Sequence, residues 1–413
     1  MITPGLLPGA TISAVKIRAV TLGLDLPAPE AVAAPFVEAA GFLSAAKQAF
    51  QTRGIQVQTT RLAGPDLGAN LIRFGTDWLV GWAAATEAAA RGAAIDYLAL
   101  GRLPAWAHAV VAEQVAPILA AGEIAFLSAD LVDARLPSVA MAAACAGAVK
   151  QLAQTTPLGF GNLRFAATAH CPSNIPFLPA AYHGGGAPCF SIAVQAADVV
   201  LETLQGPGGM SELEDRLVLA LEAATQPVER TADTLAATYG YAFGGIDLSP
   251  APFPWDDVSI GGAIEAAGVE RFGAPGTLYV AAMVTRAIRR TKVRRIGFSG
   301  LMLPVLEDSV LARRTLERPP SLHELLLYSA VCGTGLDTIP LPEDVSEAEL
   351  AGAYLDVAAL SVALDQKPLT ARLLPVPGAR AGDMTAYTFD YFFNTAVVPS
   401  VGAGAAGIVS RRQ

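Results

Sequence analysis

The stretch Lys16-Ile17-Arg18-Ala19-Val20-Thr21-Leu22, together with the helical and strand patterns after it, decides the fold class. This run is rich in apolar and β-branched residues and predicts a strand, and Ile55-Gln56-Val57-Gln58-Thr59-Thr60 predicts a second one. Between them, residues 27–53 are rich in alanine, and Gly54 ends this helical pattern. A strand, a helix and a strand in this order indicate parallel pairing, because parallel strands need a long crossover connection.

The same alternation continues along the chain. Further strands are expected at residues 95–100, 124–127, 163–169, 190–194, 241–248, 294–297 and 369–374. Apolar strands between helices are typical of a mostly parallel sheet covered by helices, and eight or more such units favour a closed barrel. The sequence contains no internal repeat or low-complexity linker. We therefore expect a single α/β domain over residues 1–413, a large closed β/α barrel with its helices outside.

The low content of charged residues indicates a large interior and suggests a homo-oligomer. Of the 413 residues, 53 % are hydrophobic and 16 % are charged, compared with roughly 25 % charged residues in average soluble domains. The net charge is −9, and the densest basic cluster, residues 286–295, lacks interleaved aromatic residues. We therefore expect no nucleic-acid partner. The four cysteines show no CxxC spacing, which argues against disulfides and a structural zinc.

Positive hydropathy does not make this a membrane protein. Residues 165–197 carry no charged side chain, but they contain four prolines and three consecutive glycines. Such a backbone could not satisfy its own polar groups in lipid. The first basic residues, Lys16 and Arg18, come too late for a signal peptide. We expect a cytoplasmic protein.

Potential chemistry is densest in Val331-Cys332-Gly333-Thr334-Gly335-Leu336-Asp337. This turn-like segment combines a thiol, two glycines with accessible backbone N–H groups, and a carboxylate that could serve as a base. Cys332 is a candidate nucleophile or acid–base group, with Gly333 beside it in the binding site. The alternative interpretation is that Cys332 is a small buried apolar residue.

His183 lies in the glycine-rich stretch Tyr182-His183-Gly184-Gly185-Gly186, after a proline-rich connection. Histidine can transfer a proton near neutral pH, and glycine lets the backbone approach a ligand closely. His183 is therefore a candidate catalytic residue. The alternative is a loop histidine that bonds a nearby carbonyl.

Asp247 ends a predicted strand and is followed closely by Ser249. In α/β folds, ligands bind at the carboxyl ends of the strands, where a carboxylate can act as a general base. The alternative is that Asp247 caps the proline-rich loop after it. Ser299-Gly300 follows another predicted strand and could present its backbone amides to a ligand.

A divalent metal is a further hypothesis, with Asp247, Glu307 and Asp308 as oxygen ligands for Mg²⁺, Mn²⁺ or Ca²⁺. The alternative for Glu307 and Asp308 is a charge pair at a helix start. The glycines at 402, 404 and 407 match G-x-G-x-x-G, but only six residues follow them, too few for the βαβ unit of a dinucleotide site. No nicotinamide cofactor is expected.

Several separated blocks of sequence resemble an uncharacterised bacterial and archaeal family known as the PFL family, after pyruvate formate-lyase. The blocks span residues 17–23, 174–184, 245–249, 273–277, 297–308, 332–344 and 382–384. The resemblance implies a barrel similar to that of the glycyl-radical enzymes, but the family has no agreed reaction. Residues 398–407 lack the glycyl-radical loop, so radical chemistry is not expected. Two departures from the family, Pro275 and the aromatic stretch 389–394, imply a bulkier, more aromatic pocket wall that includes Tyr391.

The leading hypothesis is an enzyme that acts on a small polar or anionic metabolite by acid–base or thiol chemistry at the carboxyl ends of the strands. Cys332, His183 and Asp247 would be catalytic. The backbone amides of the glycine-rich turns would hold an anionic or carbonyl group. The expected substrate-binding residues are Tyr182, Gly184, Gly185, Ser249, Ser299, Gly300, Gly333 and Tyr391. The alternatives are a non-catalytic small-molecule sensor and a divalent-metal-dependent enzyme.

Overall fold

One nine-stranded sheet, in the order β10-β11-β7-β4-β3-β2-β1-β8-β9, organises the computed structural model. The structure describes residues 15–26, 33–400, 402 and 404–411. The strands are β1 (Lys16–Gly23), β2 (Val57–Ala63), β3 (Tyr97–Leu103), β4 (Ala125–Asp130), β7 (Phe165–Ala169), β8 (Cys189–Gln195), β9 (Ala242–Asp247), β10 (Gly335–Pro342) and β11 (Leu369–Val376). A separate short pair joins β5 (Val132–Asp133) to β6 (Leu136–Pro137).

The centre of the sheet is parallel, and its flanks run the opposite way. Strands β1, β2, β3, β4 and β7 are parallel to one another. β8 is antiparallel to β1, and β9 is parallel to β8. On the other side β11 is antiparallel to β7, and β10 is parallel to β11. The carboxyl ends of the flanking strands therefore meet the amino ends of the central ones.

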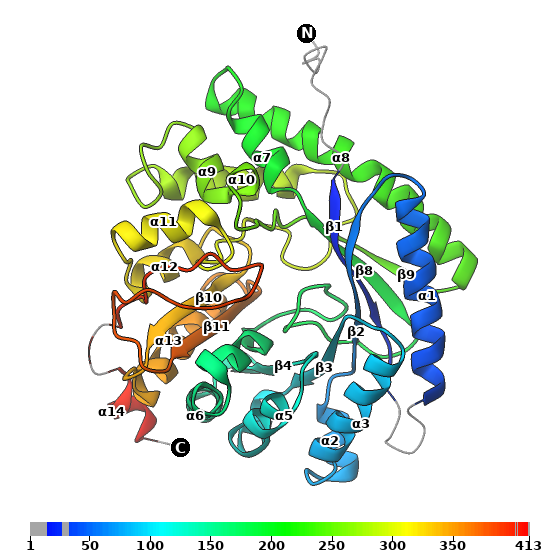
Figure 1. Ribbon diagram of the computed structural model, residues 1–413, viewed down its shortest axis with the longest axis vertical. Helices are drawn as coiled ribbons and strands as arrows, with labels where there is room; N and C mark the ends of the chain where they lie inside the picture. The colour runs from blue at the N-terminus through cyan, green and yellow to red at the C-terminus, as the bar shows by residue number, and fades with distance from the viewer. Residues whose placement is uncertain (1–14, 27–32, 401, 403, 412–413) are drawn as a thin grey trace.

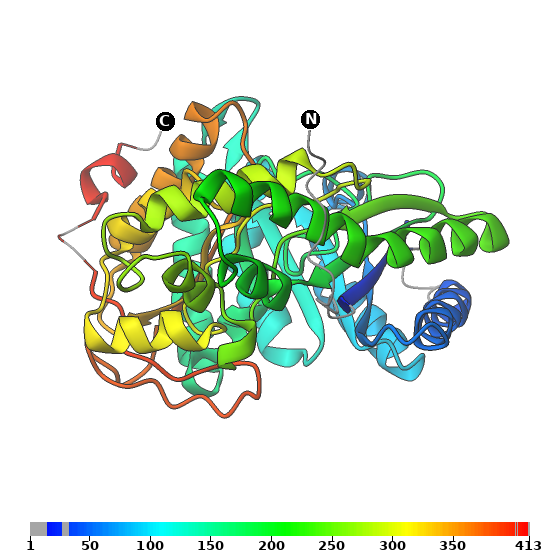
Figure 2. The same cartoon turned by 90° about the horizontal axis from the view of Figure 1, so that it is seen from above.

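Helices cover the outside of the curved sheet, and loops cross its inner side (Figure 1). The longer helices are α1 (Ala33–Gln51), α3 (Leu79–Gly92), α6 (Val139–Thr155), α8 (Met210–Tyr239), α10 (Thr277–Arg290) and α13 (Glu347–Ala363). The shorter ones are α2 (Gly68–Phe74), α4 (His108–Val110), α5 (Ala116–Ala121), α7 (Ala197–Leu204), α9 (Ile260–Ala266), α11 (Ser309–Glu317), α12 (Leu322–Ser329) and α14 (Ala406–Val409). Figure 2 shows α8 and α1 on the same side of the molecule, where α8 packs against β9. None of the described helices is both long and apolar enough to cross a bilayer.

The α/β class predicted from the sequence is confirmed, but no ladder joins edge strands β9 and β10 among the described residues. Residues 295–304 lie between them and make only isolated bridges, Ile246 with Arg295 and Pro304 with Asp337. The strand expected at residues 294–297 is therefore wrong. Strand β10 was not predicted, because Pro340 and Pro342 interrupt its pattern; an edge strand tolerates proline, since one side needs no ladder hydrogen bonds.

The main hydrophobic core fills the space between the sheet and the outer helices, with Trp82, Tyr354 and Phe42 among its largest fully buried side chains. A smaller apolar cluster lies on the inner side of the sheet, where Leu178 and Ala181 pack against Ala99 and Phe126. These two residues belong to the connection between β7 and β8, which crosses the inner face. The side chains of β1 to β4 that point inward therefore face loops rather than helices.

Candidate functional site

A cavity of about 360 Å³ lies on the inner side of the sheet. Arg18, near the amino end of β1, and Tyr97, the first residue of β3, contribute to its wall. Val194 and Asp247 line it from the carboxyl ends of β8 and β9, because these strands run in the opposite direction to β1. The cavity therefore lies at the carboxyl ends of the flanking strands and at the amino ends of the central ones.

Two arginines in this cavity are paired with buried carboxylates. Nη2 of Arg18 donates a hydrogen bond to Oε2 of Glu307 at 2.7 Å, and Nη2 of Arg372 donates to Oε1 of the same carboxylate at 3.0 Å. Arg372 also donates from Nε to Oδ1 of Asp337. Burial alone would raise the pKa of Glu307, but the neighbouring Arg372 and Arg18 guanidiniums hold that pKa below its usual value.

Arg61 also lines the cavity, and it has no carboxylate partner among the described residues. Its Nε donates a hydrogen bond to Oγ1 of Thr59 at 2.9 Å, and its guanidinium lies 5.7 Å from the centre of the Tyr97 ring. Burial, together with the charge of Arg18, lowers the pKa of Arg61 to about 10. The side chain is therefore still a cation at neutral pH, and it faces the cavity without forming an ion pair with a described carboxylate.

Aromatic side chains make up much of the remaining wall, including Phe126, Phe177, Phe389 and Tyr391. The Phe177 ring lies 5.3 Å from the Arg372 guanidinium, and Tyr97 packs edge-on against Phe126. Charged and aromatic groups thus line the same space. Such a lining suits a ligand that combines an anionic group with an apolar body.

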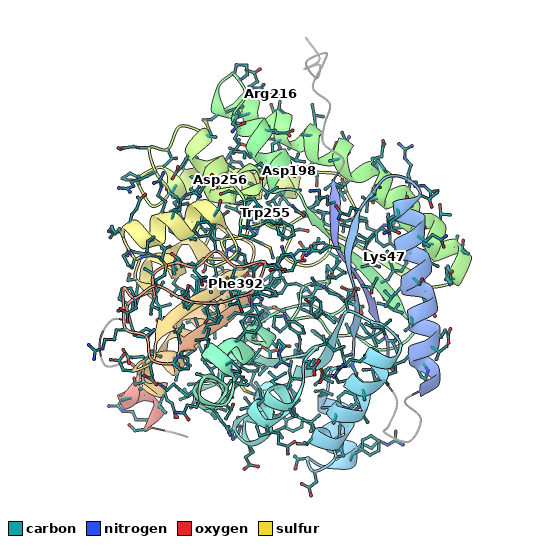
Figure 3. All side chains as sticks on the ribbon, viewed as in Figure 1. Lys47, Asp198, Arg216, Trp255, Asp256 and Phe392 are labelled. Carbon is teal, nitrogen blue, oxygen red and sulfur yellow. The ribbon has the colours of Figure 1, made fainter. Side chains whose placement is uncertain are left out.

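The loop that carries Phe389 and Tyr391 spans residues 384–396 and is held by Asn394. Oδ1 of Asn394 accepts hydrogen bonds from Tyr387 N and Thr385 Oγ1, and its Nδ2 donates to Tyr387 O at 2.9 Å. The buried ring of Phe392, which lies toward the middle of the view in Figure 3, packs edge-on against Tyr387 and Phe389. This ordered loop therefore holds Tyr391 in the wall of the cavity.

Two predicted residues, Asp247 and Ser249, also line the cavity. Oδ1 of Asp247 accepts hydrogen bonds from Ser249 N, Ser249 Oγ and Ser299 N at 2.7–3.0 Å, and Oδ2 accepts one from Phe298 N at 3.1 Å. Burial raises the pKa of Asp247, and these hydrogen bonds oppose the rise. The Asp247 carboxylate therefore links the end of β9 to the backbone of Phe298 and Ser299.

Ser299-Gly300 and Cys332-Gly333 lie against each other but do not line the cavity. A Cβ on Gly300 would lie 2.8 Å from Cα of Gly333, so this contact requires glycine. Gly300 N donates to Ser249 Oγ, and Gly333 N donates to Leu301 O. Cys332 is fully buried, and its sulfur accepts a hydrogen bond from Gly335 N at 3.4 Å. These amides and this thiol thus have partners within the protein.

The His183 segment lies apart from the cavity, at the carboxyl ends of β1 and β2. Nδ1 of the buried His183 is 3.0 Å from Oδ1 of Asn174, and Nε2 is 3.5 Å from Gly186 O. The Tyr182 hydroxyl donates to Cys171 O, and the Tyr182 ring packs on the Arg102 guanidinium. Gly184 N donates to Asn174, and Gly185 is exposed. The structure therefore does not bring His183 together with Asp247.

Glu307 and Asp308, proposed as metal ligands with Asp247, make different contacts. Glu307 is held by two arginines, whereas Asp308 caps two helices. Its Oδ1 accepts hydrogen bonds from Val310 N and Leu311 N at the start of α11, and its Oδ2 accepts them from Ile260 N and Gly261 N at the start of α9. Within the described ranges, no group of three or more His, Cys, Asp or Glu residues could hold a metal ion.

Sequence reasoning missed the arginines of the cavity, Arg18, Arg61, Arg164 and Arg372. The signal was present, because Arg18 and Arg372 lie in the middle of apolar strands, and charged side chains are rarely buried unless they are paired. The pattern of one strand does not show which charged side chain from another part of the chain will lie against it. Asp337 appeared only as a possible base near Cys332.

Comparison with known proteins places the chain in an uncharacterised family. The family described as "Uncharacterised ACR (DUF711)" matches residues 11–390. A UPF0210 protein of Pyrobaculum arsenaticum is 39 % identical over 228 residues, which cover 53 % of this chain and 51 % of that relative. A UPF0210 protein of Methanopyrus kandleri is 29 % identical over 396 residues, covering 89 % and 87 % of the two chains.

The chain thus spans about half the length of the first curated relatives that it matches, since in two further Pyrobaculum proteins the match covers 51 % and 54 % of the relative. The Methanopyrus match runs over most of both chains. The sequence blocks that indicated an uncharacterised family are consistent with these matches. The chain belongs to the DUF711 family.

Proposed function

We propose that this protein is an enzyme that binds a small organic anion in the cavity and acts on it by acid–base chemistry. One observation carries the proposal: the Arg61 cation faces the cavity without a carboxylate partner among the described residues. An unpaired charge that is partly removed from water is costly, so such a group suits a site that receives an opposite charge.

The pairing of the charged side chains favours an anionic ligand near Arg61. Arg18 and Arg372 are paired with Glu307 and Asp337, whereas Arg61 forms no ion pair among the described residues. The volume of about 360 Å³ is at the lower end of ligand pockets. A monocarboxylate with an apolar or aromatic body would match both the unpaired Arg61 guanidinium and the aromatic wall.

Acid–base chemistry is favoured over thiol chemistry. Glu307 and Asp337 line the cavity together with Arg61, and buried carboxyl groups with shifted pKa values are typical of catalytic sites. Cys332 lies outside the cavity wall and contacts backbone atoms. A sensor would share the arginine site and bind the same anion without converting it.

We further propose that residues 295–304 complete the wall of the cavity in place of a regular strand. The two isolated bridges, to Ile246 of β9 and to Asp337 of β10, support this proposal. The arrangement would then be similar to the barrel of the glycyl-radical enzymes, which the sequence resemblance implied.

The test of the anion site is thermal denaturation of the purified protein with and without monocarboxylic acids. A ligand at 100 times its Kd stabilises the folded state by about 2.7 kcal/mol, which raises Tm by several degrees. Arg61→Gln should abolish this rise because the anion loses its partner. Arg53→Gln, at an exposed helix end, is the matched control and should keep it. Equal stabilisation of wild type and Arg61→Gln would contradict the proposal.

A further inference from the structure

Strand β10 contains a bulge directly opposite Arg372. Leu336 pairs with Ala371 and Ile339 pairs with Leu373, so Asp337 and Thr338 together face the single residue Arg372 of β11. Bulges in parallel pairs are rare, and bulges in general occur often beside active sites, where they redirect a side chain.

The backbone at this bulge is strained. Thr338 has a φ of 49°, a conformation that is unusual for a β-branched residue, and its buried hydroxyl has no hydrogen-bond partner. Strain of this kind persists only where the surrounding structure imposes it, and it is concentrated at functional sites. The strained conformation of Thr338 therefore suggests that the position of its neighbour, Asp337, matters for function.

The extra residue changes which side chains face the cavity. Leu336 and Ile339 both lie beside Leu325 and Tyr328 of α12, on the outer side of β10. Strict alternation would put residues three apart on opposite faces. The bulge thus keeps both apolar side chains on the helix side while Asp337 lines the cavity.

Asp337 differs from the other buried aspartates in its hydrogen bonds. Its Oδ1 accepts from Arg372 Nε, and no group in the described part of the chain donates to its Oδ2. Both oxygens of Asp247 and both oxygens of Asp308 are occupied by backbone amides. Asp337 is therefore the buried aspartate of the cavity with an oxygen still able to accept a proton.

We propose that Asp337 is the catalytic base of this cavity and that the substrate is a 2-oxo acid with an apolar or aromatic body. The inference rests on the proposed function, since Arg61 would hold the carboxylate. The C–H bond beside the carbonyl breaks, and its electron pair moves to the carbonyl oxygen to form an enolate. The proton forms an O–H bond with Oδ2 of Asp337, and return of a proton to carbon restores the carboxylate.

The chemistry of a carboxylate base leads to this substrate class. A carboxylate is a weak base, so the C–H group must be made acidic by a neighbouring carbonyl, and the cavity arginines can stabilise the enolate charge. The charged groups that act on Asp337 are Arg372, Glu307 and Arg18. Burial raises the pKa of Asp337, and Arg372 offsets only part of the rise, which brings the group nearer to a working base.

The test follows exchange of the C3 protons of pyruvate, 2-oxobutyrate and phenylpyruvate in D2O by proton NMR, above the rate without protein. Asp337→Asn should slow exchange about 100-fold or more, while the acid still stabilises the folded variant. Asp344→Asn, at an exposed position just after β10, is the matched control and should exchange like wild type. The wild-type rate should rise with pH as Asp337 ionises, and this rise should be lost in Asp337→Asn.

The outcomes separate the two proposals. Stabilisation by an acid without exchange in wild type, or exchange by Asp337→Asn at the wild-type rate, overturns the role of Asp337 and leaves the anion site standing. Failure of every acid to stabilise the wild type contradicts the proposed anion site, and the inference falls with it. If Asp337→Asn does not fold, Asp337→Glu retains the charge beside Arg372. If the Tm of Asp337→Glu equals that of wild type, a slower exchange rate in this variant supports the proposal, and exchange at the wild-type rate overturns it.

Discussion

Buried carboxylates in this protein differ in what their oxygens contact, and this decides what each residue can do. Asp247 and Asp308 are both bound by several backbone amides, so replacing either would release N–H groups inside the protein. Glu307 is bound by two guanidiniums. Asp337 has a guanidinium on one oxygen only. At the scale of single residues, the free acceptor is what distinguishes a candidate base from a structural carboxylate.

Cys332 is expected to be structural. Cys332→Ala should lower stability by about 1–2 kcal/mol, because it removes a buried atom from a packed site, and it should leave anion binding unchanged. All four cysteines are buried, so a thiol reagent should label none of them quickly in the native state and all four after denaturation. Cys145→Ala, in the hydrophobic core, is the control for simple loss of packing. Fast native labelling that disappears in Cys332→Ala would contradict this interpretation.

At the scale of elements, Asp308 joins two helices through one side chain. It supplies the N-cap of α11 and also accepts hydrogen bonds from Ile260 N and Gly261 N at the start of α9, and Ser259 Oγ donates to it at 2.6 Å. The negative charge also favours the positive end of each helix dipole. Helices α9 and α11 are therefore held together by an interaction that occupies both oxygens of Asp308.

Asp308→Ala should cost about 2–4 kcal/mol of unfolding free energy, because it leaves several buried N–H groups without a partner. Ser346→Ala is the matched control, since Ser346 caps only α13 and is exposed; it should cost about 1 kcal/mol. Urea denaturation of the two variants beside wild type measures both values. Equal losses would show that Asp308 acts as an ordinary cap of one helix.

At the scale of the whole molecule, ion pairs link helices of the outer layer. Glu214 of α8 accepts hydrogen bonds from Arg286 and Arg290 of α10, which are about half-exposed. The hydrogen bonds from Arg286 hold the pKa of Glu214 below its usual value, although burial opposes this. The pKa of Glu214 is lower in the folded protein than in the unfolded chain. The ion pairs therefore stabilise the fold fully at pH values above the unfolded pKa, and this stabilisation is lost as the pH falls through the folded pKa.

Glu214→Gln should therefore lower stability at pH 7 by about 1 kcal/mol, and the difference from wild type should shrink as the pH is lowered below about 4. Denaturant unfolding at a series of pH values measures this difference. Glu212→Gln, on the same helix and largely exposed, is the control and should show little effect at any pH. A difference for Glu214→Gln that stays constant with pH would exclude the ion pairs as its cause.

The sequence by itself determined the α/β class, most strands and the long helices, because apolar periodicity and helix ends are local properties of the chain. It also indicated the family and three of the expected site residues that line the cavity, Asp247, Ser249 and Tyr391. Only the tertiary structure decided the direction of β8, which puts the carboxyl ends of β8 and β9 beside the amino ends of the central strands. It likewise separated His183 and Cys332 from the cavity and brought Arg18, Arg61 and Arg372 into it. Those outcomes depend on pairing between segments hundreds of residues apart, and a local pattern carries no information about which distant charge a side chain will meet.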